Sequence, residues 1–326
     1  MSLGSLAAEL APAYQTGELV VGRLAAVSPA PFAVALVFHL AKLGAHARAW
    51  HNIVRAAYPA DRVRFRDTIG AFLAGVGVGA VVPSRAGELV RLGLLKARLP
   101  GATFAGLVST LLAEQAFETF VKVAVVGVAL AFGLGAGVPG SALILGPLAH
   151  HPLIATLAGA GAALVTAALG VRRRERIRLL LCDARRGFAV FTPPSRYLRG
   201  VVSWQILAWA LRLASVYAFL VAFHVSASIA TALLVVVVQL LAAVVPTPGG
   251  AGSQQAMLVV ALSATAAVTV LGFGIGMQAA TALADLVVGA ASLIALTGSL
   301  RWRRLALRRD TPRPQPVAQP QPTGGR

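Results

Sequence analysis

The stretch AVVPSRAG at residues 80–87 recurs as AVVPTPGG at residues 243–250. Both copies share the frame Ala-Val-Val-Pro-(Ser/Thr)-x-x-Gly, and each stands at the edge of an apolar segment. Proline lacks a backbone donor and clashes with the preceding turn, so each copy interrupts a helix. The repeated interruption indicates two structurally related halves. Chance is the alternative, because short words of Ala, Val and Pro arise easily in a chain of this composition.

The composition indicates that both interruptions belong to a membrane protein. Hydrophobic residues make up 57% of the 326 residues and charged residues 12%, whereas soluble domains carry about 25% charged residues. Several windows hold about 20 apolar residues, enough to cross a bilayer core. They lack the alternation of barrel strands. We predict an all-α polytopic integral membrane protein with roughly six to eight membrane segments, two re-entrant or broken helices and a possible inverted repeat.

The formal net charge of +18 also fits a membrane protein. Basic residues gather in loops between the apolar segments, and membrane proteins carry an excess of Lys and Arg in their cytoplasmic loops. This rule accounts for the positive charge, so we do not expect nucleic-acid binding. Residues 1–24 form an extracytoplasmic or interfacial segment in this prediction, and residues 25–300 form one transmembrane domain. Residues 301–326 form a basic juxtamembrane stretch and a disordered Pro-rich tail, placed in the cytoplasm.

Three ionisable residues follow the first interruption. Arg85, Glu88 and Arg91 are spaced by three, so on a helix they share one face. Charged groups at membrane depth are costly and mark candidate functional sites. A guanidinium binds phosphate through two parallel hydrogen bonds, which favours a seat for a lipid phosphate. The alternative is an interfacial helix whose ion pairs satisfy one another.

Other charged residues stand inside apolar segments. Glu114 and Glu118 share one helix face and can bind a cationic headgroup or exchange protons, although Lys122 is placed to pair with Glu118. Arg212 lies in the middle of an apolar helix and needs a partner, which Glu114 or Asp285 can supply. Asp285 is either that partner or a site for a proton or headgroup.

Catalytic and metal-binding motifs are not evident in the sequence. It contains no Gly-x-Ser-x-Gly elbow, no His-Glu-x-x-His pair and no Walker loop. The histidines are scattered, and no pair combines ligand spacing with a carboxylate on the same helix. We therefore expect no enzyme activity, no metal and no cofactor.

Three motifs together carry a resemblance to a known family. PSRAGELVRLGLL (83–95) resembles its signature P-x-R-x-G-E-x-x-R, and VPTPGGAGSQQAML (245–258) resembles P-x-P-G-G-x-G. RAWHNIVRA (48–56) resembles a segment R-x-W-x-x-L-L-R-A. Over residues 30–300 the chain thus resembles the lysylphosphatidylglycerol synthase transmembrane region, also called the flippase-like domain family.

The resemblance implies a multi-pass protein of the bacterial or archaeal cytoplasmic membrane that moves or binds a phospholipid or related polar-headed lipid. In multi-domain synthases of this kind, the region moves an aminoacylated phospholipid between leaflets, and a separate cytosolic domain attaches the amino acid. Only a short tail follows residue 300 here, so aminoacyl transfer is not expected. The alternatives are a non-transporting subunit that docks an enzyme of lipid or envelope-glycan synthesis, and a proton-coupled transporter of a small solute.

The implied site combines both interruptions. Arg85 and Arg91, with backbone N–H groups of residues 249–252, would hold the phosphate, while Glu88 and Glu114 would hold the rest of the headgroup. Relatives commonly carry Arg and then Glu where this chain has Gln254 and Gln255, which leaves the second interruption neutral. The predicted substrate-binding residues are Arg85, Glu88, Arg91, Glu114, Glu118, Arg212, Pro248, Gly249, Gly250, Gly252, Gln255 and Asp285.

Overall fold

The computed structural model describes residue 22 and residues 26–82, 86–131, 197–242 and 252–297. These residues form helices and no strand, which confirms the predicted all-α class. The helices are α2 (Pro29–Ala57), α3 (Phe65–Val81), α4 (Ala86–Lys96), α5 (Phe104–Ala131), α10 (Ser203–Ala222), α11 (Ile229–Ala242), α12 (Ser253–Ala261) and α13 (Ala267–Thr297), with a π-helical turn, η2 (Leu198–Val202), before α10.

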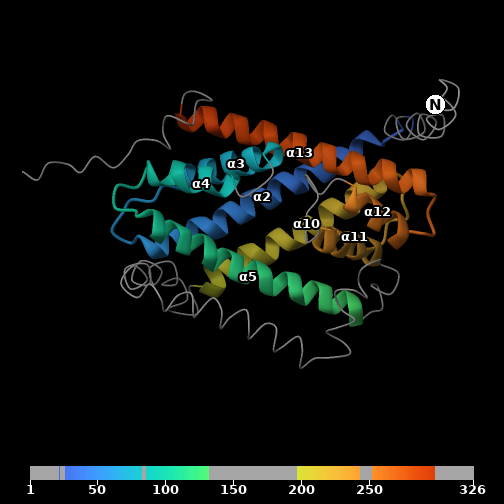
Figure 1. Ribbon diagram of the computed structural model, residues 1–326, viewed down its shortest axis with the longest axis horizontal. Helices are drawn as coiled ribbons and strands as arrows, with labels where there is room; N and C mark the ends of the chain where they lie inside the picture. Colours follow the sequence, from blue (N-terminus) through green and yellow to red (C-terminus); the bar gives the residue numbers. More distant parts are fainter. Residues whose placement is uncertain (1–21, 23–25, 83–85, 132–196, 243–251, 298–326) are drawn as a thin grey trace, which may run out of the picture.

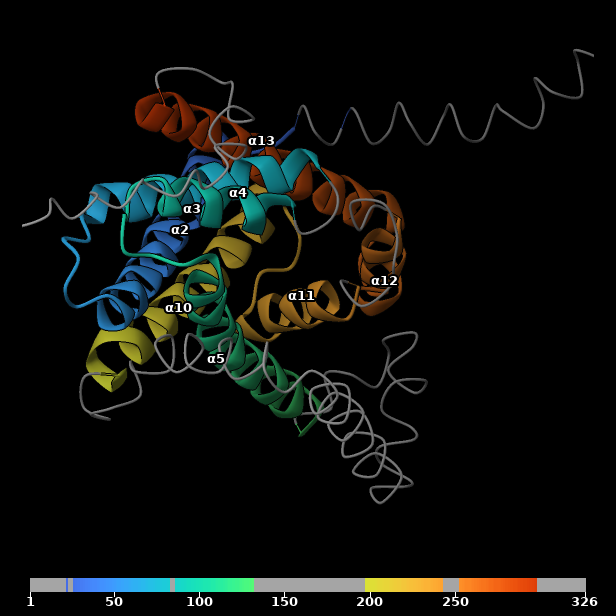
Figure 2. The ribbon, with the colours of Figure 1, turned by 60° about the vertical axis from the view of Figure 1, so that its left-hand side comes forward.

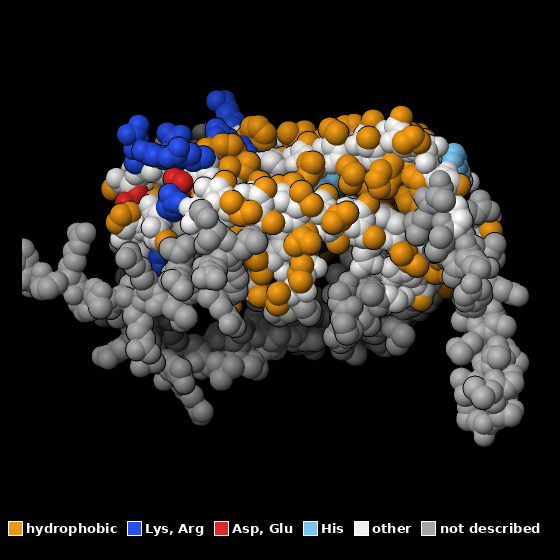
Figure 3. Space-filling view, turned by 90° about the horizontal axis from the view of Figure 1, so that it is seen from above, with side chains coloured by type: hydrophobic (Ala, Val, Ile, Leu, Met, Phe, Trp, Pro, Cys, Tyr) orange, Lys and Arg blue, Asp and Glu red, His pale blue; other side chains and the backbone are white. Residues whose placement is uncertain are grey.

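Three helical segments are long and apolar enough to cross a membrane. They are Pro29–Ala57, Leu198–Ala222 and Ala267–Thr297, and the second combines η2 with α10. The face drawn in Figure 3 carries a broad apolar surface, with the basic side chains gathered at one end of it. A belt of exposed apolar side chains is what the lipid-facing surface of a membrane protein requires. The fold is therefore that of a membrane-embedded helical protein.

The helices α2 and α10 lie side by side and run in opposite directions (Figures 1 and 2). The backbone N–H of Ser28, at the start of α2, donates to the carbonyl of Ala222 at 3.0 Å. The Ser215 hydroxyl donates to the carbonyl of Ala35 at 2.8 Å. At the other end, the Asn52 amide donates to the carbonyl of Gly200 at 2.5 Å. Small and polar residues of this kind hold membrane helices together.

The first interruption separates two short helices that pack against each other. At 1.5 Å per residue, the 17 residues of α3 and the 11 of α4 are each shorter than the ~30 Å hydrocarbon core. Gly75 and Gly87 bring the two backbones together, since a Cβ on Gly75 would lie 2.6 Å from the Gly87 carbonyl oxygen. The pair is a hairpin of two short helices, and residues 83–85, which connect them, lie outside the described residues.

The second interruption separates another pair of short helices in contact, α11 with 14 residues and α12 with 9. Within the described residues, each half therefore contains, in order, a long helix, two short helices and a long helix. The halves also exchange contacts: α3 packs on α13, and α11 packs on α5 (Figure 2). Together with the antiparallel α2 and α10, this arrangement matches the expected inverted repeat.

Candidate functional site

A polar cavity of about 290 Å³ lies among the long helices. Its lining includes the polar side chains His39, Lys42, Arg212, Ser215, Gln239, Gln254, Gln278, Thr281 and Asp285. Gln239 and Gln254 lie on the short helices α11 and α12, and the others come from the central parts of all three helical segments that are long enough to span a membrane. The cavity therefore lies at the depth where charged groups are most costly in lipid.

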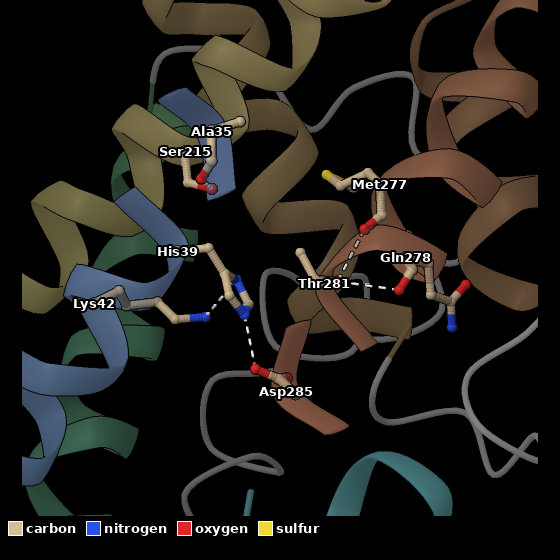
Figure 4. A network of polar contacts seen from close by, with 8 residues as sticks. All are labelled: Ala35, His39, Lys42, Ser215, Met277, Gln278, Thr281 and Asp285. Carbon is tan, nitrogen blue, oxygen red and sulfur yellow. Dashed lines mark hydrogen bonds and ion pairs between the residues drawn. The ribbon is translucent and has the colours of Figure 1, made fainter. Parts of the chain in front are cut away.

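The centre of this cavity holds a connected set of polar groups from α2 and α13 (Figure 4). The His39 Nε2 atom lies 2.8 Å from Oδ1 of Asp285. The Lys42 Nζ atom lies 3.3 Å from Nδ1 of His39. One imidazole tautomer satisfies both contacts, since Nδ1 accepts from the ammonium and Nε2–H donates to the carboxylate. Asp285 is thus held by histidine and not by arginine.

Arg212 binds an uncharged partner. Its guanidinium donates to Oε1 of Gln239 at 3.0 Å, and it makes no ion pair with an acidic group of the described residues. We expected Glu114 or Asp285 as its partner, but packing of the helices brings those carboxylates to other groups. The lining side chains of the described cavity thus include two cations, Lys42 and Arg212, and one carboxylate, Asp285.

A second cavity of about 340 Å³ lies beside the first hairpin. Arg91 and Glu114, on its wall, form a buried ion pair with an N–O distance of 2.5 Å. The guanidinium also lies over the ring of Trp50 at 3.6 Å and that of Phe72 at 4.6 Å. Arg91 thus forms an internal ion pair, as in the alternative to a phosphate site, but its partner is Glu114 on α5 and not a residue of its own helix. Glu88 lines the same cavity.

Glu118 faces two basic groups. Its carboxylate lies 3.3 Å from Nζ of Lys122, one turn further along α5, as the spacing of four predicted. It also lies 3.5 Å from Nδ1 of His46 on α2. The local pair was visible in the sequence, whereas the contact between helices was not.

The described part of the second interruption is neutral and ordered by hydrogen bonds. Gly252 has φ 92°, a conformation that favours glycine, and its N–H donates to Oε1 of Gln255 at 2.7 Å. Nε2 of Gln255 donates to Oε1 of Gln278 at 2.6 Å. This pair links α12 to α13 across 23 residues of sequence, the same separation as Arg91 and Glu114, which link α4 to α5. The two halves therefore carry matching links, ionic in one and amide in the other.

Four predicted site residues lie outside the described residues: Arg85, Pro248, Gly249 and Gly250. The others divide between the two cavities. Arg212 and Asp285 line the first, and Glu88, Arg91, Glu114 and Glu118 line the second. Gln255 is next in sequence to Gln254 and donates to Gln278, and both of these residues line the first cavity. Gly252 donates to Gln255.

Sequence reasoning missed three residues of α2. His39, Lys42 and His46 occupy positions i, i+3 and i+7, which fall on one helix face. His39 and Lys42 line the first cavity, and His46 lines the second. Their spacing is a usable signal, because it places three titratable side chains on one face of an apolar helix.

Comparison with known families and proteins identifies one relation. No curated protein and no solved structure matches the chain. The sequence model of the family described as "Lysylphosphatidylglycerol synthase TM region" matches residues 14–297, which include every described helix. The match and the apolar helices indicate a membrane protein related to lipid, and the chain belongs to the lysylphosphatidylglycerol synthase TM region family.

Proposed function

We propose that this protein binds the polar headgroup of a phospholipid or related lipid in the first cavity and moves it across the cytoplasmic membrane. The observation that supports this proposal is a polar cavity with an excess of cationic side chains at the centre of three apolar helices. The acyl chains would remain in the bilayer while the headgroup passes. Membrane phospholipids are the expected partners, and this work requires no covalent step, so we expect no enzyme activity.

The chemistry of the lining suits an anionic headgroup. Arg212 presents a planar set of donors that matches phosphate oxygens, and its present partner is a neutral amide that a phosphate can replace. Lys42 supplies a second positive charge on the same cavity. Gln254, Gln278 and Thr281 add uncharged donors and acceptors for hydroxyl groups of a headgroup.

The inverted arrangement of the halves suggests how the headgroup would move. In transporters built from inverted repeats, the substrate site lies near the midplane between the repeats, beside interrupted helices. The two halves then rock against each other around that site. Here α2 and α10, the antiparallel pair, both contribute to the cavity.

The direct test is reconstitution into liposomes. The purified protein is mixed with fluorescent lipids that are anionic, aminoacylated or glycosylated, and accessibility of each lipid to a membrane-impermeant quencher is followed over time. We expect faster exchange between leaflets for at least one phosphate-bearing lipid than in protein-free liposomes. If none of these lipids exchanges faster, the proposed function is wrong.

Replacing Arg212 with glutamine is expected to slow lipid exchange by about tenfold to a hundredfold. The change removes one charge-assisted hydrogen bond to phosphate, which contributes about 1.5–3 kcal/mol. Glutamine retains an amide that can still contact Gln239, so the fold should persist. The matched control is Arg62→Gln, because Arg62 is exposed and remote from this cavity. Equal exchange rates for the Arg212 variant and the unmodified protein would contradict the assigned role.

A further inference from the structure

One face of α2 carries two pairs of histidine and carboxylate. His39 and His46 are seven residues apart, and each meets an acidic residue from another helix. The His39 Nε2 atom lies 2.8 Å from Oδ1 of Asp285 on α13. The His46 Nδ1 atom lies 3.5 Å from Oε1 of Glu118 on α5. Histidine and carboxylate side chains in membrane helices are the groups from which proton relays are built.

The two pairs open onto different cavities. His39 and Asp285 line the first cavity, and His46 and Glu118 line the second. Asp285 and His46 are partly exposed, at 21% and 20%, whereas the His39 side chain is buried. Lys42 lies between them on the same face, 3.3 Å from His39 Nδ1 and one turn from His46. Titratable groups therefore follow α2 from one cavity to the other.

Other charged groups face these pairs. Lys42 and Arg212 share the cavity of His39 and Asp285. Glu88, Arg91, Glu114 and Lys122 share the cavity of His46 and Glu118. Within the second cavity Arg91 is neutralised by Glu114, and Lys122 contacts Glu118 directly.

The charge of the first cavity depends on Asp285. It is the acidic side chain in the described lining, which also contains the cations Lys42 and Arg212. A proton bound there removes the negative charge and raises the net positive charge of the cavity by one. An anion then binds more strongly, and by reciprocity a bound anion strengthens proton binding by the same factor. The cavity is thus built to take up a proton and an anion together.

We propose that this protein is a symporter of protons and anionic lipid headgroups, with the Asp285–His39 pair as the proton-binding site and His46–Glu118 as a second station. This proposal rests on the proposed function. A proton from water on one side binds the Asp285 carboxylate or the His39 imidazole as the headgroup enters. After the halves rock, headgroup and proton leave to the other side, and both side chains return to their starting state. For a headgroup with one negative charge, the cycle moves no net charge.

The experiment uses the full chain in liposomes with fluorescent phosphatidylglycerol and a pH difference of about one unit across the bilayer. Coupling of one proton to one anion predicts about tenfold enrichment of the lipid in the leaflet facing the alkaline side, since one pH unit is a tenfold ratio of proton activity. A potassium diffusion potential should leave the enrichment unchanged. A trapped pH-sensitive dye should report protons that move with the lipid.

Variants locate the proton site. We expect D285N and H39Q to lose the lipid enrichment that the pH difference drives, and D285E to retain it. The matched control is D67N, because Asp67 contacts Arg98 outside the two cavities. D67N should behave as the unmodified protein does.

The outcomes separate the two proposals. Lipid exchange that is unaffected by pH difference overturns symport and leaves the proposed function standing. Enrichment that persists in D285N and H39Q overturns the assigned site. Proton movement that requires Asp285 but occurs without lipid movement overturns the proposed function and with it the coupling. If the unmodified protein moves neither lipid nor protons, both the proposed function and the symport proposal are wrong.

Discussion

The E114A variant is expected to lose about 3–5 kcal/mol of folding free energy, the usual effect of removing one partner from a buried ion pair. The Arg91 guanidinium would remain buried between Trp50 and Phe72 without its carboxylate. Arg91 is 8% exposed and Glu114 is 4% exposed, so little water reaches the pair in the folded protein. The free energy of unfolding in mixed micelles measures the effect.

A double variant tests the cause. Arg91→Met together with Glu114→Leu removes both charges and fills similar space, so it should recover most of the stability that E114A loses. E88A serves as the control, because Glu88 lines the same cavity but is not the ion-pair partner of Arg91. If E114A and E88A lower the free energy of unfolding equally, the buried pair is not what stabilises this region.

The G289A variant is expected to lose about 3 kcal/mol, at the upper end of the range for overpacking. Gly289 on α13 crosses Gly77 on α3, and a Cβ on Gly77 would lie 2.7 Å from the Gly289 Cα atom. A Cβ on Gly289 would meet backbone atoms of Gly77 and the carbonyl oxygen of Leu73. Backbone cannot rotate aside as a side chain can, so α3 and α13 must separate.

The matched control for this prediction is G93A. Gly93 also lies inside a helix, but a Cβ there meets nothing within 4 Å. Alanine should stabilise α4 at this position by about 0.5–1 kcal/mol through its better helix propensity. Unfolding of both variants under the same conditions separates the two effects. A G289A protein as stable as G93A would show that the close crossing of α3 and α13 is not required.

Stability and transport are expected to respond to different residues. Arg91–Glu114 and Gly77–Gly289 hold helices together, so their variants should unfold more readily. Arg212 and Asp285 line the first cavity and are partly exposed to it, so Arg212→Gln and D285N should keep the fold, with slower lipid exchange in the first and no enrichment across a pH difference in the second. Measuring both properties for each variant distinguishes the two classes.

The helical membrane fold and the two interruptions can be predicted from the sequence alone. Apolar length and proline chemistry act over a few residues, so they can be read without knowing what packs where. The pair of Glu118 and Lys122 was predictable for the same reason, because a spacing of four fixes their proximity on a helix. The family relation also followed from local motifs, PSRAGELVR and VPTPGGAG.

Which charged groups pair with one another depends on how the helices pack. Arg91 pairs with Glu114, Asp285 with His39, and Arg212 with Gln239. Each contact joins two helices, and its formation depends on the rotation and tilt of both, which are set by packing across the bundle. Sequence spacing carries no information on those angles. The polar face of α2 could therefore be recognised as part of the site only from the structure. There α13 brings Asp285 to His39, and α5 brings Glu118 to His46.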